Sequence, residues 1–314
     1  MLRRLFFLLC AVLLLRSEEV GSLRARAHGL TYTKTDGELI ISFARSSTNR
    51  DGDQVEIYDA LGNWLTGVKV LGSVADADGV SIYDVSARRD ERIAVAADFV
   101  NKSGIVPALL YFDFKGTILS AVALDASREI RLLAIDNDLG VWALGMGTGQ
   151  LNPVDVPLVV SYDSRGAVRK ELLKRADFPA DAAIIQEGPG YGTPAMGLTP
   201  DGIWIWLTGS KELVTIAGSD LSVTRMVTSL PEPQPHARLD LVRMIKTSSG
   251  QLIGEFSERE EGPPHVSFYR WSRESASWST SASQDCRNHF LIGTLKSRPA
   301  FIGFGTGSVC VGEK

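Results

Sequence analysis

The chain of 314 residues carries 33 Lys and Arg against 37 Asp and Glu, which gives a formal net charge of -4. This balance lacks the basic excess of a nucleic-acid-binding protein, so we exclude that class of partner. The length fits two ordinary domains or one large closed β architecture, and the patterns along the chain must decide between them.

The N-terminus has the pattern of an export signal. Arg3 and Arg4 precede an apolar run, residues 5–15, that is too short to cross a bilayer as a helix. We predict a signal peptide over residues 1–22 with cleavage after Ser22, or after Ala27 as a second choice. An uncleaved anchor is the alternative. The protein is expected to be secreted or periplasmic, with no other membrane contact and a single domain over residues 23–314.

Cleavage would remove Cys10 and leave Cys286 and Cys310 as the two cysteines of the mature chain. An even pair in an oxidising compartment favours a disulfide, the alternative being two unrelated buried thiols. Closing a loop of this size stabilises a fold by about 3 kcal/mol on the chain-entropy model. We therefore predict a bridge between Cys286 and Cys310.

A polar turn followed by an apolar strand recurs six times along the chain. When one turn position of each copy is taken as equivalent, the copies are 54, 49, 62, 48 and 49 residues apart. The copies are KTDGELIISF from Lys34, ARRDERIAVAA from Ala87, DNDLGVWALG from Asp136, TPDGIWIWLT from Thr199, TSSGQLIGEF from Thr247 and LKSRPAFIGF from Leu295.

A second pattern, two strands joined by a tight turn, lies between these segments. In three copies an aspartate ends the first strand and a glycine follows three residues later, at Asp59, Asp113 and Asp163. Aspartate accepts hydrogen bonds from backbone N–H groups ahead of it, and glycine takes the positive φ of the turn. We predict that these aspartates are structural. The copies are VEIYDALGNWL from Val55, LLYFDFKGTIL from Leu109, VVSYDSRGAVR from Val159, LVTIAGSDLSV from Leu213 and VSFYRWSRESAS from Val266.

Together the two patterns give four short antiparallel strands in about fifty residues, which is the unit of a propeller blade. No segment shows the 3.6-residue apolar period of a helical repeat. We therefore predict an all-β, six-bladed β-propeller of four-stranded antiparallel blades. In TPDGIWIWLT, Trp204 and Trp206 alternate with aliphatic residues, as expected for a strand that neighbouring blades cover on both sides.

This register resembles six-bladed propellers of the NHL-like and TolB-like kind, in which a turn with Asp and Gly precedes an apolar strand. The resemblance covers nearly the whole mature chain and implies the architecture alone. The first pattern has six copies and the second has five, so the last blade lacks one strand. We expect the N-terminal strand of the mature chain, around Leu23 to Leu30, to complete that blade and close the ring, since open sheet edges are a liability.

The longest predicted loops all leave one face of the ring, which we call the long-loop face. Loops on a rigid scaffold are where propellers usually bind, so we expect an exported, monomeric binding or scaffold module for a protein, peptide or glycan. His236 and Arg238 are weak candidates for binding residues in a Pro-rich loop. The loops are residues 46–54, 99–107, 146–157, 175–194, 229–238 and 257–265.

The alternative is a metal-dependent hydrolase or lyase with carboxylates that converge on the central channel and hold Ca²⁺. We expect no cofactor otherwise, because no histidine has metal-ligand spacing and no catalytic motif is present. Three or more acids at one point would favour the enzyme. The candidate acids are Asp76, Asp78, Asp125, Asp181 and Glu187, followed by Asp240 and Asp285.

Overall fold

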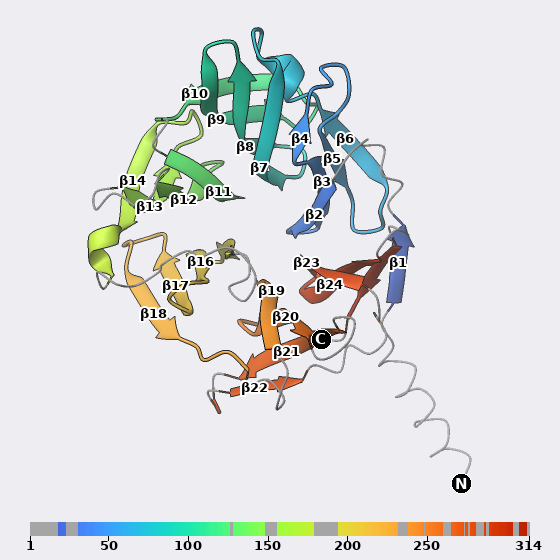
Figure 1. The fold of residues 1–314 in the computed structure, drawn as a ribbon, viewed down its shortest axis with the longest axis vertical. Helices are drawn as coiled ribbons and strands as arrows, with labels where there is room; N and C mark the ends of the chain where they lie inside the picture. The colour runs from blue at the N-terminus through green and yellow to red at the C-terminus, as the bar shows by residue number, and fades with distance from the viewer. Residues whose placement is uncertain are drawn as a thin grey trace.

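The ring of six antiparallel sheets predicted from the repeats is present in the computed structural model (Figure 1). The described residues form 25 strands and two short 3-10 helices, η1 (Leu71–Ser73) and η2 (Arg175–Asp177). The structure describes residues 18–22, 31–125, 128–147, 156–178, 194–231, 238–247, 249–259, 265–272, 274–275, 277–280, 286, 289–303 and 308–312.

Each of the first five blades starts at its innermost strand and ends at the rim of the ring. Blade 1 contains β2 (Thr31–Asp36), β3 (Leu39–Ala44), β5 (Val55–Tyr58) and β6 (Trp64–Val68). Blade 2 contains β7 (Gly79–Arg88), β8 (Arg92–Asn101), β9 (Gly104–Asp113) and β10 (Ile118–Ala123), with β4 (Ser46–Ser47) added beside β7. Blade 3 contains β11 (Arg128–Ile135), β12 (Val141–Gly147), β13 (Pro157–Tyr162) and β14 (Val168–Lys174).

The remaining blades complete the circle. Blade 4 contains β15 (Ala195–Thr199), β16 (Gly202–Leu207), β17 (Glu212–Ala217) and β18 (Val223–Val227). Blade 5 contains β19 (Arg238–Lys246), β20 (Leu252–Arg259), β21 (His265–Ser272) and β22 (Ser277–Thr280). Blade 6 contains β23 (His289–Leu295), β24 (Arg298–Gly303), β25 (Ser308–Val311) and β1 (Glu18–Ser22).

The core is divided among the interfaces between blades. Six clusters of buried apolar side chains are present, and each contains residues from two adjacent blades, including the pair of blade 6 and blade 1. Every blade therefore contributes to two clusters, one on each face of its sheet. Burial of an aliphatic side chain stabilises the fold by about 1.5 to 3 kcal/mol, so most of the stability comes from these interfaces.

Strand β16 shows why both faces are apolar. Trp204 and Trp206 pack with Phe256 and other side chains of blade 5. The aliphatic side chains between them pack on the opposite face with Leu144 and other side chains of blade 3. The two-sided burial predicted for this strand is confirmed.

The aspartates of the second pattern are structural, as predicted. In each turn, Oδ1 of Asp59, Asp113 or Asp163 accepts the N–H groups of the residues two and four positions ahead, at 2.7 to 2.9 Å. The glycine three residues after each aspartate has a φ of 81° to 86°. The backbone N–H groups of Ala167 and Arg165 also lower the pKa of Asp163, because they stabilise the ionised carboxylate.

Residues 99–107 are not the long loop that the sequence predicted. Strand β8 runs on to Asn101 and β9 begins at Gly104, with Val100 paired to Ile105. The neighbouring strand β7 is equally long and pairs on its other side with β4. The extended sheet lets these residues pair their backbone groups, so the loop is a two-residue hairpin turn.

The ring closes through an N-terminal strand, as predicted, but at another position. Strand β1 pairs antiparallel with β25, with Glu18 opposite Val311 and Ser22 opposite Ser308. Figure 1 shows β1 beside the strands of blade 6. The predicted closing segment, residues 23–30, lies outside the described residues. The residues that complete the blade thus fall within the segment predicted to be a signal peptide, and cleavage after Ser22 would remove them.

The predicted disulfide is present. Cys286 and Cys310 are joined at an S–S distance of 1.99 Å, with their Cα atoms 6.0 Å apart. Both side chains are buried in the cluster between blades 5 and 6, so the bridge ties β25 to the chain just before β23. A disulfide of this kind fits an oxidising compartment. In the described part of the chain, no helix is long and apolar enough to span a bilayer.

Removal of β1 tests the closure. A chain that begins at Leu23 leaves backbone groups of β25 unpaired, and we expect it to melt at least roughly 5 °C below a chain that begins at Ser17. Thermal denaturation followed by circular dichroism measures the difference. Equal melting temperatures would show that β1 does not close the ring.

Removal of the disulfide tests its contribution to the interface between blades 5 and 6. The double substitution Cys286→Ser with Cys310→Ser should lower the free energy of unfolding by about 3 kcal/mol, because the unfolded chain regains the freedom of an open loop. Urea titration with and without a reductant provides the measurement. The reductant should destabilise the wild-type protein and leave the double variant unchanged; an equal response of the two proteins contradicts this role.

Candidate functional site

Two adjoining cavities lie toward one side of the ring. We call this side the short-turn face; it is formed by the turns that join the first to the second strand and the third to the fourth strand of each blade. One cavity is a cleft of about 530 Å³ between blades 3 and 4. The other is the central channel, with a cavity of about 540 Å³ lined by residues of all six innermost strands. Asn137 and Leu198 line both cavities, so the cleft leads toward the channel.

A buried ion pair joins blades 1, 2 and 3 in the channel. Nζ of Lys34 donates to both carboxylate oxygens of Asp84, at 2.8 and 2.9 Å, and Oδ2 of Asp84 also accepts the N–H group of Leu133 at 2.7 Å. Although burial works against it, the carboxylates of Asp84 and Asp36 raise the pKa of Lys34. Both carboxylate oxygens of Asp84 are therefore bonded within the fold, and they hold the innermost strands of blades 1, 2 and 3 together.

Asp36 makes a parallel connection. Its Oδ2 accepts the hydroxyl of Ser86 at 2.5 Å and the N–H group of Ala87 at 3.0 Å, and Oγ of Ser86 accepts the N–H group of Ile135 at 2.9 Å. Burial raises the pKa of Asp36, since the charged form loses its hydration. These bonds link β2, β7 and β11 a second time.

A third connection joins blades 5, 6 and 1. Oε2 of Glu255 accepts the N–H group of Leu291 at 2.7 Å, and the side chain is only 1% exposed. Arg243 lies opposite Glu255 in the register of β19 and β20 and donates to the carbonyl groups of Leu291 and Thr33. Its guanidinium group lies 4.8 Å from the ring centroid of Tyr32. Burial raises the pKa of Glu255 to about 7.

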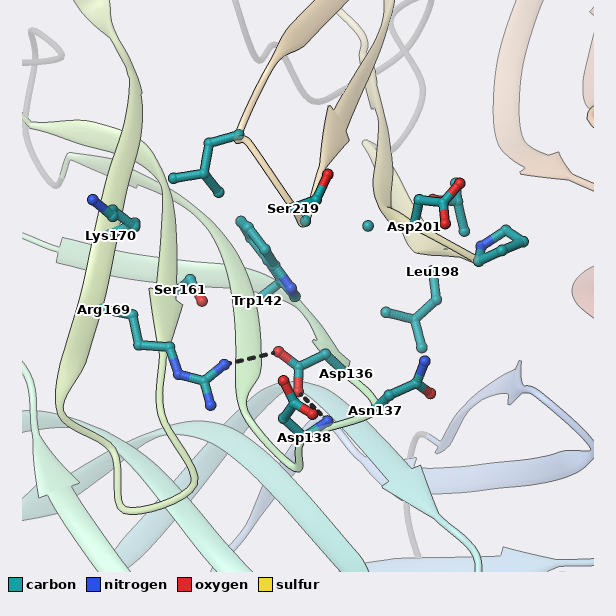
Figure 2. Close-up of a pocket in the computed structure, with 15 residues that line it drawn as sticks. Asp136, Asn137, Asp138, Trp142, Ser161, Arg169, Lys170, Leu198, Asp201 and Ser219 are labelled. Carbon is teal, nitrogen blue, oxygen red and sulfur yellow. Dashed lines mark hydrogen bonds and ion pairs between the residues drawn. The ribbon is translucent and has the colours of Figure 1, made fainter.

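The cleft between blades 3 and 4 has a rigid wall from blade 3. The side chain of Trp142 lies at its centre and is only 5% exposed, because it packs in the cluster shared by the two blades (Figure 2). Beside it, Arg169 donates to Oδ2 of Asp136 at 3.2 Å. Oδ1 of Asp136 accepts the N–H groups of Asp138 and Gly140, at 3.0 and 2.8 Å, so both oxygens of this carboxylate are fixed.

Two glycines set this geometry. A Cβ atom at Gly140 would lie 2.6 Å from the guanidinium nitrogen of Arg169 and 2.7 Å from the carbonyl oxygen of Tyr162. A Cβ atom at Gly202 would lie 2.0 Å from the carbonyl oxygen of Ile216. Only glycine fits at these positions without a shift of the backbone, and each one begins or precedes the second strand of its blade.

The opposite wall comes from the end of β15 and from two turns of blade 4. Asp201 and Leu198 face the blade 3 side chains across Trp142, and Ser219 lies above it (Figure 2). Leu198 is 41% exposed, which is high for an apolar side chain in a cavity. The N–H group of Gly218 donates to the carbonyl group of Asp201, which joins the two turns. The wall is therefore built from tight turns and not from a long loop.

The candidate acids of the sequence do not form a site in the part of the chain that the structure describes. Asp76 and Asp78 lie in the link between β6 and β7, Asp125 follows β10, and all three side chains are exposed and away from the channel lining. Asp240 is buried in β19. Among the described residues, no group of three or more His, Cys, Asp or Glu is placed to hold a metal ion.

The other candidates cannot be placed in a site. Asp181, Glu187, Asp285 and His236 lie outside the described residues. Arg238 is the first residue of β19.

The residues that line the cleft were missed by the sequence analysis. Asp136 and Asp201 stand in the turns of two consecutive copies of the first pattern, where their residue types are typical of turns. The signal that could have found them is the stacking of adjacent copies, which brings the turn of one blade beside the turn of the next.

Comparison with known proteins does not assign an activity to this chain. No protein-family model matches the sequence, and no curated protein is similar enough to count as a relative. Among solved structures, the chain is similar to a glucose dehydrogenase with 11% identity and a TM-score of 0.48 over 91% of this chain and 99% of that chain. The class of the protein, a six-bladed β-propeller, follows from its own sheets.

Two further similarities also cover most of the chain. One is to an oligogalacturonate lyase in complex with manganese, with 13% identity and a TM-score of 0.47 over 87% of this chain and 73% of that chain. The other is to YCF48 bound to D1 peptide, with 10% identity and a TM-score of 0.44 over 93% of this chain and 94% of that chain. At these values the comparisons do not assign a ligand.

Glu255 should make stability depend on pH. Its pKa rises from 4.5 to about 7 on folding, so the stabilisation from the protonated form is complete below about pH 4.5 and is lost as the pH rises through 7. Relative to the wild type, Glu255→Gln should therefore gain about 3 kcal/mol in free energy of unfolding between pH 4.5 and about pH 8. Urea titrations across this range give the values. Asp51→Asn, at an exposed position, is the control, and parallel curves for wild type and Glu255→Gln would contradict the assignment.

Proposed function

We propose that the chain is an exported binding module that holds its ligand in the cleft between blades 3 and 4, on the short-turn face. The observation that carries the proposal is the cleft itself, whose volume of about 530 Å³ lies in the range typical of ligand pockets. The Cys286–Cys310 bridge supports an oxidising compartment. The predicted N-terminal export signal agrees with such a compartment, but β1 is retained only where the signal is not cut after Ser22.

The rim of the cleft offers polar groups that the fold does not use. Within the described residues, the side chains of Asp138, Lys170 and Asp201 make no hydrogen bond, although their neighbours Asp136 and Arg169 are bound to each other. Exposed polar side chains around a packed aromatic floor are a typical arrangement for recognition. A protein, peptide or glycan ligand would reach these groups from solvent.

The channel supports a binding module better than an enzyme. Three of its ionisable residues, Lys34, Asp36 and Asp84, bond to one another or to groups of adjacent blades. The carboxylates of Asp84 and Asp36 raise the pKa of Lys34 against the effect of burial, and burial raises the pKa of Asp36, so both shifts have a structural cause. The described residues thus give no support to a metal-dependent hydrolase.

The proposal differs from the sequence-based hypothesis in the face that binds. That hypothesis favoured the long-loop face, where several predicted loops lie outside the described residues. The cleft is built on short turns and buried strands, so the backbone positions of its lining residues are fixed before a ligand arrives. Preorganised groups lose less conformational entropy on binding.

Ligand screening with matched variants tests the proposal. Peptide and glycan arrays would identify binders, and calorimetry would then compare wild type with Asp201→Asn and Lys170→Gln. Loss of a hydrogen bond to a charged group costs about 1.5 to 3 kcal/mol, so we expect affinity to fall roughly tenfold or more.

The controls are Asp51→Asn and Lys115→Gln, which change exposed residues of the same types outside the cleft. Both should bind as the wild type does. Equal binding by the cleft variants and the controls would place the ligand elsewhere and end the proposal.

A further inference from the structure

The cleft presents donors and acceptors of hydrogen bonds side by side. Arg169 and Lys170 donate from blade 3, and Asp201 accepts from blade 4 (Figure 2). The hydroxyl groups of Ser161 and Ser219 can do both. A ligand that fits this lining should both donate and accept at closely spaced positions, and a hydroxyl group does both with a single atom.

The charge of the cleft is nearly balanced. Two basic residues, Arg169 and Lys170, line the cleft together with three carboxylates, those of Asp136, Asp138 and Asp201. The carboxylates would repel a strongly anionic ligand, and the two basic side chains would repel a strongly cationic one. A neutral ligand meets neither repulsion, so charge favours an uncharged molecule.

The floor and one side of the cleft are apolar. Trp142 lies at the centre, with Leu198, Pro200 and Leu221 beside it. A pyranose ring has an apolar face of C–H groups and an edge of hydroxyl groups, so it can pack on such a floor while its hydroxyl groups reach the polar rim. A lipid would leave the rim unpaired, and a polyanion would find too little positive charge.

We infer that the ligand of this cleft is a neutral oligosaccharide, an inference that rests on the proposed binding function and names its ligand class. A chain is favoured over a single sugar because the cleft is open toward the channel, where Asn137 and Leu198 are shared walls. Arg88 donates to Oδ1 of Asn137 at 3.2 Å and holds it at this passage. Sugar units beyond the cleft would lie along the short-turn face toward the channel mouth.

A length series tests the ligand class. The probes are neutral gluco-, xylo- and manno-oligosaccharides from one unit to six, uronic-acid oligosaccharides, and an array of unmodified peptides. We expect a neutral series to bind, its affinity to rise at least tenfold from monosaccharide to tetrasaccharide, and its affinity to change less than twofold between low and high salt.

Substitutions then locate the site. Asp201→Asn and Lys170→Gln should weaken the tetrasaccharide roughly tenfold or more, whereas Asp51→Asn and Lys115→Gln should not. Asn137→Ala should reduce the gain in affinity from chain length, because Asn137 lies where the cleft meets the channel. Melting temperatures of all variants within about 2 °C of the wild type would show that each one folds.

The outcomes separate this inference from the proposed function. Binding of peptides or of salt-sensitive acidic saccharides, weakened by the cleft variants, would overturn the neutral oligosaccharide and retain the cleft as a binding site. Neutral saccharides that bind equally to cleft variants and controls would overturn both conclusions, as would a protein that binds none of the probes.

Discussion

Each blade of this protein is a sheet with two apolar faces, and this constraint governs the rest of the structure. A sheet of this kind is unstable alone and needs a neighbour on each side, which only a closed circle supplies for every member. The six buried clusters correspond to the six interfaces of such a circle. One of these interfaces joins the last blade to the first, and the last blade is itself completed by strand β1 and fastened on its other face by the Cys286–Cys310 bridge.

The same constraint explains the polar residues of the channel. The innermost strands have one edge toward the channel, and some of their backbone N–H groups have no partner strand there. Side chains from adjacent blades supply the missing acceptors: Asp84 for Leu133, Ser86 for Ile135, Thr35 for Thr294 and Glu255 for Leu291. A propeller channel that contains acids is therefore no sign of catalysis until these backbone partners have been accounted for.

Periodic features of the fold could be predicted from the sequence, because each depends on residues close together in the chain. The two-sided strand β16, the aspartate turns and the number of blades are of this kind. The position of the closing strand could not be predicted, since Glu18 to Ser22 has no apolar pattern and is defined by its pairing with β25. The extended hairpin at residues 99–107 also depends on a distant partner, because β4 supports β7 from outside the blade's own repeat.

The cleft could not be predicted because it also depends on partners that are distant in the sequence. Asp136 is the clearest example. Its Oδ1 binds the N–H groups of the residues two and four ahead, as the oxygens of Asp59, Asp113 and Asp163 do in their turns.

The second oxygen of the carboxylate distinguishes the Asp136 turn from the other aspartate turns. In the Asp59 turn, Oδ2 is used locally by the side chain of Asn63, whereas Oδ2 of Asp136 holds Arg169 in another strand. Gly140 leaves room for that guanidinium group. A repeated structural turn thus becomes one wall of a binding cleft through a single added partner, and the stability of the turn and the geometry of the cleft depend on the same carboxylate.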